Sequence, residues 1–128
     1  MSALTTRSNA IISHTGVNFS GKEGYLLKEN SGALAINDSA TAAARAVVLN
    51  GEVAANDSSV GILGAIAGTV KLKLSGSVTK YNLVQQVNDG TVTVDAGTGN
   101  RVLVGVALET GVSGDLIEVA TFAPRLAS

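Results

Sequence analysis

The chain contains no cysteine, and this absence excludes several kinds of site at once. Disulfide frameworks, cysteine-ligated zinc sites and thiol nucleophiles all need a sulfur that the sequence does not supply. Large rings are also scarce, because the 128 residues include two phenylalanines, two tyrosines and no tryptophan. The core must therefore be built from small aliphatic side chains, which pack sheets closely but offer few large groups to line a deep ligand pocket.

Neither sign of charge is in excess. Nine lysines and arginines stand against ten aspartates and glutamates, so the formal net charge is -1. Nucleic-acid-binding proteins normally have a basic surface and aromatic side chains for base stacking, so we expect no nucleic-acid partner. The N-terminal segment lacks the apolar stretch of a signal peptide, and no apolar run is long enough to span a membrane. We therefore expect a chain that is made inside the cell and has no membrane partner.

Catalytic groups are also missing from the sequence pattern. The single histidine, His14, lies between a serine and a threonine, and adjacent side chains of an extended chain point apart and cannot form a nucleophile–base pair. GTGNR at residues 97–101 lacks the Lys-Ser/Thr ending of a phosphate-binding loop. The Asn-Asp-Ser stretches at 37–39 and 56–58 lack the spacing of a calcium loop and are typical of turns. We expect no catalytic residue, no cofactor and no metal, hence no enzyme.

Short aliphatic and threonine-rich runs between turn residues predict strands. The expected strands are residues 25–29, 33–37, 46–50, 60–66, 69–74, 83–87, 91–95, 101–108 and 116–122. Such closely spaced strands predict an all-β fold, a small β-barrel or sandwich. Alternation is clearest in residues 70–74 and 91–95, which predicts strands with one face in solvent. Residues 101–108 are apolar on both faces, which predicts a strand covered on both sides.

The alternation also predicts which side chains face the core. They are Val70, Leu72, Leu74, Val92, Val94, Val102, Val104, Val106 and Leu108. Asn50-Gly51 and Asp89-Gly90 are dipeptides that favour turns. Residues 39–45, reading SATAAAR, predict a short helical turn capped by Asp38 or Ser39.

The N-terminal part differs from the rest of the chain. Residues 1–21 are polar and rich in serine, threonine and asparagine. We interpret them as an extended N-terminal arm that lies on a partner chain rather than on its own barrel, and residues 22–128 as the β-barrel domain. The alternative is a frayed terminus.

The most specific pattern lies in the last third of the chain. VGVALETG at residues 104–111 is followed by GDLIEV at 114–119, and GTVKL and DGTV occur earlier, at 68–72 and 89–92. These motifs resemble the head-decoration (capsid cement) protein family of tailed bacteriophages. The resemblance covers residues 24–119. Members of that family begin with the barrel almost at once, so the longer arm is a departure from the pattern.

The resemblance implies a structural virion protein that binds the outer surface of an icosahedral phage capsid and stabilises it. The protein would be made in the host cytoplasm, its partner would be the major capsid protein, and it would self-associate as a homotrimer where three capsid subunits meet. We expect these contacts in the arm and in two loops, at Ile11, Ile12, His14, Val17, Phe19, Asn50, Gly51, Gly111, Ser113 and Asp115.

A second class of function is left open. A glycan- or ligand-binding β-module acting as a surface adhesin is the alternative to a decoration protein. Such modules usually display aromatic platforms. This chain has few aromatic rings, so its composition favours the decoration protein over the adhesin. An enzyme is a distant third.

Overall fold

The computed structural model describes residues 11–15, 19–54, 57–66 and 68–128. These residues form ten strands and no helix. The strands are β1 (Ile11–Thr15), β2 (Leu26–Asn30), β3 (Ala33–Ile36), β4 (Ala46–Ala54), β5 (Asp57–Ile62), β6 (Val70–Lys73), β7 (Leu83–Gln86), β8 (Val92–Val94), β9 (Arg101–Ala107) and β10 (Leu116–Ala127). The all-β fold expected from the sequence is confirmed.

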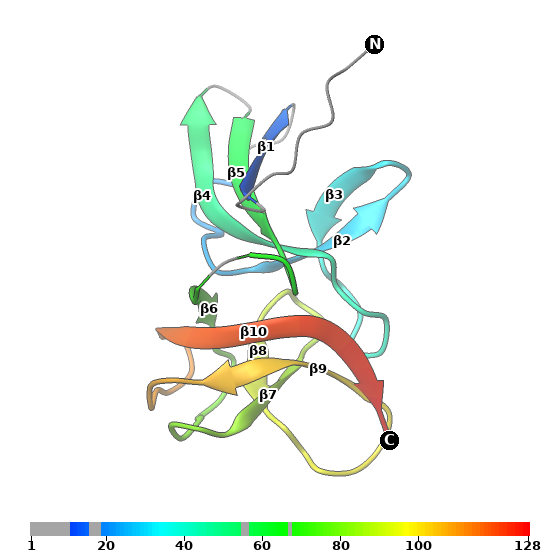
Figure 1. The fold of residues 1–128 in the computed structure, drawn as a ribbon, viewed down its shortest axis with the longest axis vertical. Helices are drawn as coiled ribbons and strands as arrows, with labels where there is room; N and C mark the ends of the chain where they lie inside the picture. Colours follow the sequence, from blue (N-terminus) through cyan, green and yellow to red (C-terminus); the bar gives the residue numbers. More distant parts are fainter. Residues whose placement is uncertain (1–10, 16–18, 55–56, 67) are drawn as a thin grey trace.

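The strands form two five-stranded sheets that lie one above the other in Figure 1. Sheet 1 has the order β1-β5-β4-β2-β3, and sheet 2 has the order β6-β10-β9-β7-β8. Paired strands within both sheets are antiparallel. The first half of the chain therefore builds one sheet and the second half builds the other.

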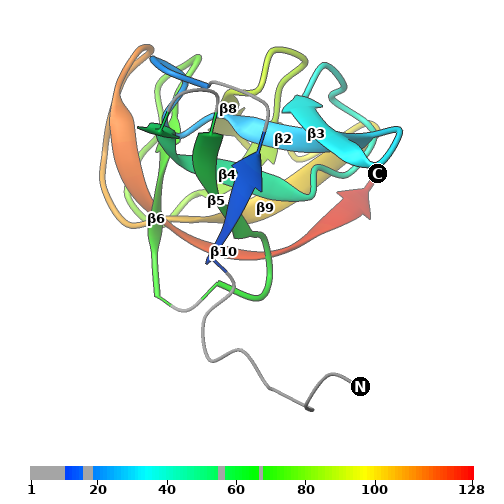
Figure 2. The ribbon, with the colours of Figure 1, turned by 90° about the horizontal axis from the view of Figure 1, so that it is seen from above.

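Sheet 2 curls back on itself into a half-barrel. Its two outer strands, β6 and β8, meet through a parallel bridge between Leu74 and Val92, and Ser75 N donates to Val92 O at 2.9 Å. The long β10 follows this curvature as an arc below sheet 1 (Figure 2). Its register against β9 shifts between Thr121 and Arg125, and such irregularities let a strand bend.

The turn before β2 joins the two sheets. Gly24 N donates to Val48 O in sheet 1 at 2.9 Å, and Gly24 O accepts from Lys73 N in sheet 2 at 3.0 Å. Gly24 has a φ of +83°, and a Cβ there would lie 2.4 Å from Leu116 Cδ2. Only glycine fits both the backbone conformation and this close approach.

The larger core lies between the two sheets. It combines residues of sheet 1 and of the turn after it, such as Leu26, Val47 and Leu63, with the inward side chains of sheet 2. A smaller apolar cluster lies apart from it and contains Phe19, Leu27, Ala46, Val48 and Val60. Adjacent residues of β2 and β4 thus belong to different clusters, as the two-residue period of a strand requires.

Most of the predicted core residues are buried. Val70, Leu72, Leu74, Val92, Val102 and Val104 are at most 4% exposed. Val106 and Leu108 are half-buried. The expectation for Val94 is wrong: its side chain is 38% exposed, because β8 is an outer strand of sheet 2 and ends at this residue. The expectation that β9 is covered on both sides is confirmed, since all its residues except Val106 are buried.

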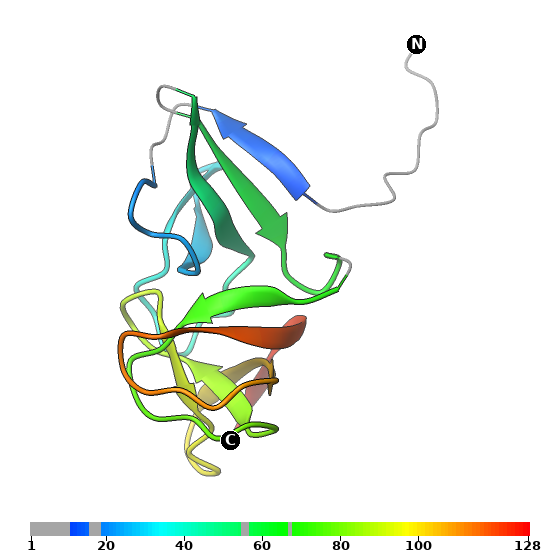
Figure 3. The same cartoon turned by 90° about the vertical axis from the view of Figure 1, so that its left-hand side faces the viewer.

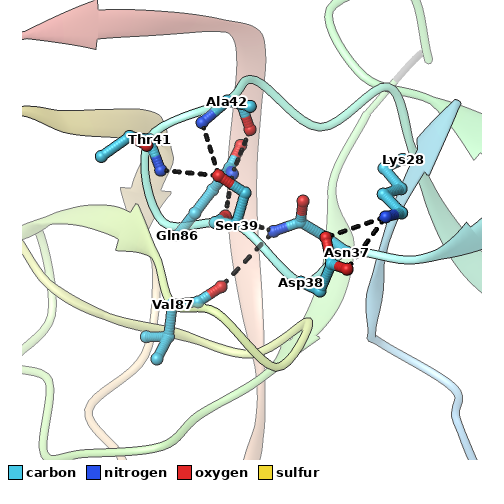
Figure 4. A network of polar contacts seen from close by, with 8 residues as sticks. All are labelled: Lys28, Asn37, Asp38, Ser39, Thr41, Ala42, Gln86 and Val87. Carbon is cyan, nitrogen blue, oxygen red and sulfur yellow. Dashed lines mark hydrogen bonds and ion pairs between the residues drawn. The ribbon is translucent and has the colours of Figure 1, made fainter.

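The predicted helical turn at residues 39–45 does not form. The segment is an irregular loop between β3 and β4, although Ser39 uses its side chain as a helix cap would. Its Oγ accepts hydrogen bonds from Thr41 N at 3.2 Å and Ala42 N at 2.9 Å (Figure 4).

A buried glutamine, Gln86, forms hydrogen bonds with three further backbone groups of this loop. Gln86 Oε1 accepts from Ala44 N at 2.7 Å, and Gln86 Nε2 donates to Ser39 O at 3.1 Å and Ala42 O at 2.9 Å. These bonds occupy groups that a helix would have paired internally, so the capping serine leads into a loop instead.

Of the two predicted turn dipeptides, one is confirmed. Gly90 has a φ of +88° in the turn between β7 and β8. Asn50-Gly51, in contrast, lies inside β4, where the register against β5 shifts on both sides of Asn50. An Asn-Gly pair can occur in a tight turn or at an irregularity within a strand, and in this chain it lies at a strand irregularity.

Candidate partner-binding surface

The predicted contact residues of the arm belong partly to the chain's own sheet. The backbones of Ile11, Ile12 and His14 pair with Gly61, Val60 and Ser58 as part of β1. The expectation that this segment lies on a partner chain rather than on its own barrel is therefore wrong for Ile11–Thr15. Val17 and residues 1–10 lie outside the described residues. The division of the chain at residue 21 stays a prediction.

Phe19 and Gly51 hold the chain after β1 against β4. Phe19 is 5% exposed, and its N–H donates to Gly51 O at 2.8 Å. Gly51 is buried, its N–H donates to Glu23 Oε2 at 2.8 Å, and a Cβ there would lie 2.0 Å from Phe19 O. Both residues thus serve internal packing. Asn50, next to them, is exposed.

The other predicted contact residues lie in the loop between β9 and β10. Gly111 is buried and exchanges two backbone hydrogen bonds with Val78, at 2.9 and 3.0 Å. Asp115 accepts a hydrogen bond from Val112 N at 2.9 Å through its carboxylate, and Ser113 is exposed. The loop is therefore held to the rest of sheet 2, and its tip faces solvent.

The structure adds two apolar side chains to this loop that sequence reasoning missed. Val112 is 57% exposed at the loop tip, and Tyr81 is 69% exposed in the turn between β6 and β7. The two segments are joined, because Lys80 N donates to Thr110 Oγ1 at 3.0 Å and Tyr81 N donates to Ala107 O at 2.7 Å. An aromatic residue outside every predicted strand was the available signal.

The backbone at Tyr81 has an uncommon conformation. Its φ is +76°, in the left-handed region that costs a bulky residue roughly 1 kcal/mol. Hydrogen bonds from Asn82 N to Thr79 O at 3.0 Å and from Thr79 N to Asn82 Oδ1 at 3.1 Å hold the turn. Lys80 Nζ lies 5.0 Å from the centre of the Tyr81 ring. We call Lys80, Tyr81 and Val112 the loop patch: an exposed aromatic and an exposed aliphatic group on fixed turns.

One ion pair fixes the loop at the opposite end of β9. Arg101 and Asp95 have side chains that are 11% and 16% exposed, and Arg101 Nε donates to Asp95 Oδ1. Arg101 Nη1 also donates to Gly99 O at 3.0 Å. The Arg101 hydrogen bond, followed by one from Gly97 N, lowers the pKa of Asp95, and burial opposes this change. The pair is part of the scaffold.

A second, exposed ion pair lies near the 39–45 loop. Lys28 Nζ donates to both carboxylate oxygens of Asp38 at 2.9 Å (Figure 4). The Lys28 hydrogen bond and charge lower the pKa of Asp38. The side chains are 34% and 68% exposed, so this pair is worth little for stability.

The described residues contain no group of three or more histidine, cysteine, aspartate or glutamate side chains placed to hold a metal ion. In the same part of the chain, no helix is long and apolar enough to cross a membrane. In comparisons with known proteins, no family model and no curated protein matches the chain.

Proposed function

We propose that this chain is a decoration protein, which binds the outer surface of an icosahedral phage capsid and stabilises it through contacts with the major capsid protein. The observation that carries the proposal is the loop patch. It lies beside the hairpin formed by the residues that resemble the decoration family, because the VGVALETG and GDLIEV motifs span the end of β9, the loop and the start of β10. Tyrosine is among the residues enriched at interface hot spots, and Tyr81 is 69% exposed on a turn that hydrogen bonds hold in place.

Repetition explains how a small patch stabilises a shell. Each copy buries a modest interface, and many copies on one lattice together resist the internal pressure of packaged DNA. Copies cluster as homotrimers where three capsid subunits meet, since closed cyclic symmetry satisfies exposed surfaces. An electron-density map of the particle that shows isolated copies, without contacts between like chains, would refute the trimer and leave the capsid-binding role intact.

The test compares phage particles that contain the chain with particles that lack it. Heads should assemble in both cases, because the protein acts on the finished shell. Particles without it should release their DNA at lower temperature, and also on salt or chelator stress, as measured by a DNA-binding dye. Particles that survive these treatments as well as the wild type would contradict the proposal.

The adhesin remains the second candidate, and the exposure of Tyr81 is the observation that favours it. An exposed ring beside a lysine can stack on a sugar face. The same pair of particle preparations separates the two functions. Loss of host attachment with unchanged particle stability would support the adhesin and contradict the decoration role.

A further inference from the structure

A cleft of about 380 Å³ lies where the two sheets meet, beside β6. In Figure 3, β6 is the green strand of sheet 2 that lies next to sheet 1, with β10 below it. The cleft is lined by the turn before β2, by β4, by the segment that leads into β6, and by the start of β10. It shares no residue with the loop patch.

The lining is largely apolar. Val48 and Val70 are 1% and 4% exposed, and Leu49 and Ile66 are half-buried. Leu116 is 39% exposed although it is a large aliphatic residue. An aliphatic chain entering the cleft would cover this surface and remove it from water, which is favourable.

A strand edge also faces the cleft. In an antiparallel pair, alternate residues direct their N–H and C=O groups toward the partner strand. Leu74 N donates to Asp115 O at 2.9 Å, on the β10 side, whereas Lys73 N donates to Gly24 O at 3.0 Å, on the opposite side. Lys71 therefore directs its peptide groups away from β10 as Lys73 does, and it lines the cleft. An extended peptide could pair with this edge.

Two carboxylates with open oxygens complete the cleft. Glu23 Oε2 accepts from Gly51 N at 2.8 Å, and Glu118 Oε2 accepts from Thr69 Oγ1 at 2.6 Å. Neither Oε1 receives a hydrogen bond from the described residues. The charged residues that line the cleft are these two carboxylates and one cation, Lys71, so the net charge of the lining is negative. Each carboxylate is thus oriented by one bond and still able to accept another.

We infer that this cleft binds an extended peptide segment that carries an arginine or lysine side chain. The aliphatic stem of that side chain lies on the apolar lining, its charged head binds the open oxygens of Glu23 and Glu118, and its backbone pairs with the Lys71 edge. The inference goes beyond the proposed function, because it concerns a different surface and holds whether or not the chain binds a capsid.

The test titrates the full ¹⁵N-labelled chain with acetyl-Val-Arg-Val-amide and, separately, with acetyl-Val-Gln-Val-amide, followed by NMR. The arginine peptide should shift the amide signals of Leu49, Thr69, Lys71 and Glu118. The glutamine peptide should bind at least about fivefold more weakly, because it lacks the charge-assisted hydrogen bonds to both carboxylates. Equal binding of the two peptides, or shifts that avoid these amides, would overturn the inference.

A matched pair of variants sharpens the result. Glu118→Gln keeps an oxygen that can accept from Thr69 and removes the charge, so it should weaken the arginine peptide and leave the glutamine peptide unchanged. Glu29→Gln is the control, because Glu29 also accepts one backbone hydrogen bond, from Gly32 N at 2.7 Å, but lies outside the cleft. Equal affinity of E118Q and wild type for the arginine peptide would contradict the inference. The wild-type comparison of peptides decides the matter if E118Q does not fold.

Discussion

Gln86 shows what a single side chain can decide in this fold. It is fully buried and forms three hydrogen bonds to the backbone of the 39–45 loop. The sequence correctly marks Ser39 as a residue that caps backbone N–H groups. It does not reveal that the glutamine that competes with a helix lies more than 40 residues further along the chain. Local propensity therefore predicts the chemistry of the serine but not the structure that follows it.

Replacing Gln86 by leucine should destabilise the protein strongly. Gln86→Leu keeps a similar side-chain volume but leaves the N–H of Ala44 and the C=O of Ala42 without their partner, which should cost about 2–4 kcal/mol. Ser39 O keeps a hydrogen bond from Asn37 Nδ2 at 2.8 Å. The control is Gln85→Leu, because Gln85 is half-buried and forms one side-chain hydrogen bond, with Ala96 N at 2.8 Å. Urea unfolding measures both variants. Equal stability of Q86L and Q85L would show that the network contributes nothing.

The ion pair of Asp95 with Arg101 should make stability depend on pH. The folded-state pKa of Asp95 lies below its ordinary value of 3.8, so the pair stabilises the fold above that pH. This stabilisation is lost as the pH falls through 3.8 toward the folded-state pKa. Asp95→Asn should reduce the drop in unfolding free energy below about pH 4. Asp38→Asn, in the exposed pair, should change it less. An unaltered pH profile in D95N would contradict this account.

At the scale of elements, strand existence was more predictable than strand extent. Nine of the ten strands of the described residues overlap an expected run, because alternation and turn residues are local signals, whereas the ends of β4, β5 and β10 differ from the expected ends by three to five residues. Two findings lay beyond them. The sequence predicts that residues 11–15 belong to an arm on a partner chain, because the polar residues around them conceal the pairing of β1 with β5. β4 continues through Asn50-Gly51, where the sequence predicts a turn. The close contact of Gly51 with Phe19 is a tertiary feature that the local sequence does not reveal.

Gly51→Ala tests why β4 needs a glycine at this point. A Cβ would lie 2.0 Å from Phe19 O and 2.4 Å from Phe19 C, so the backbone itself must move, at a cost of about 1–3 kcal/mol. Gly76→Ala is the control. It also lacks a positive φ, and its Cβ would first meet a side-chain atom, Thr93 Oγ1, at 2.8 Å. Thermal unfolding should show a clearly larger loss for G51A, and similar losses would contradict the proposed contact.

At the scale of the whole molecule, the sequence predicted the fold class and one end of the candidate surface. Repeated strand signals lead to an all-β fold whatever the order of the strands. The resemblance directed attention to the 109–115 loop, but Tyr81 joins that loop only because β6, β7 and β9 share one sheet. The pairing of distant strands is not a local property, so the composition of the loop patch needed the structure.

Tyr81→Asn tests the loop patch as a whole-molecule interface. Asparagine tolerates the left-handed backbone conformation, so the variant should fold normally while losing the ring. Its affinity for assembled shells should fall about tenfold or more, as expected for an aromatic hot spot. Leu126→Asn is the control, since Leu126 is 70% exposed but lies near the C-terminal end of β10. If Y81N and L126N bind shells equally well, the loop patch is not part of the interface.

Many copies of this chain should bind one shell, and co-sedimentation measures this binding. The purified full chain is mixed at increasing concentration with assembled, expanded shells that lack it, and the pelleted protein is quantified against the major capsid protein. We expect saturable binding at a fixed ratio set by the capsid lattice. If the chain remains in the supernatant at every concentration, it is not a decoration protein of that shell.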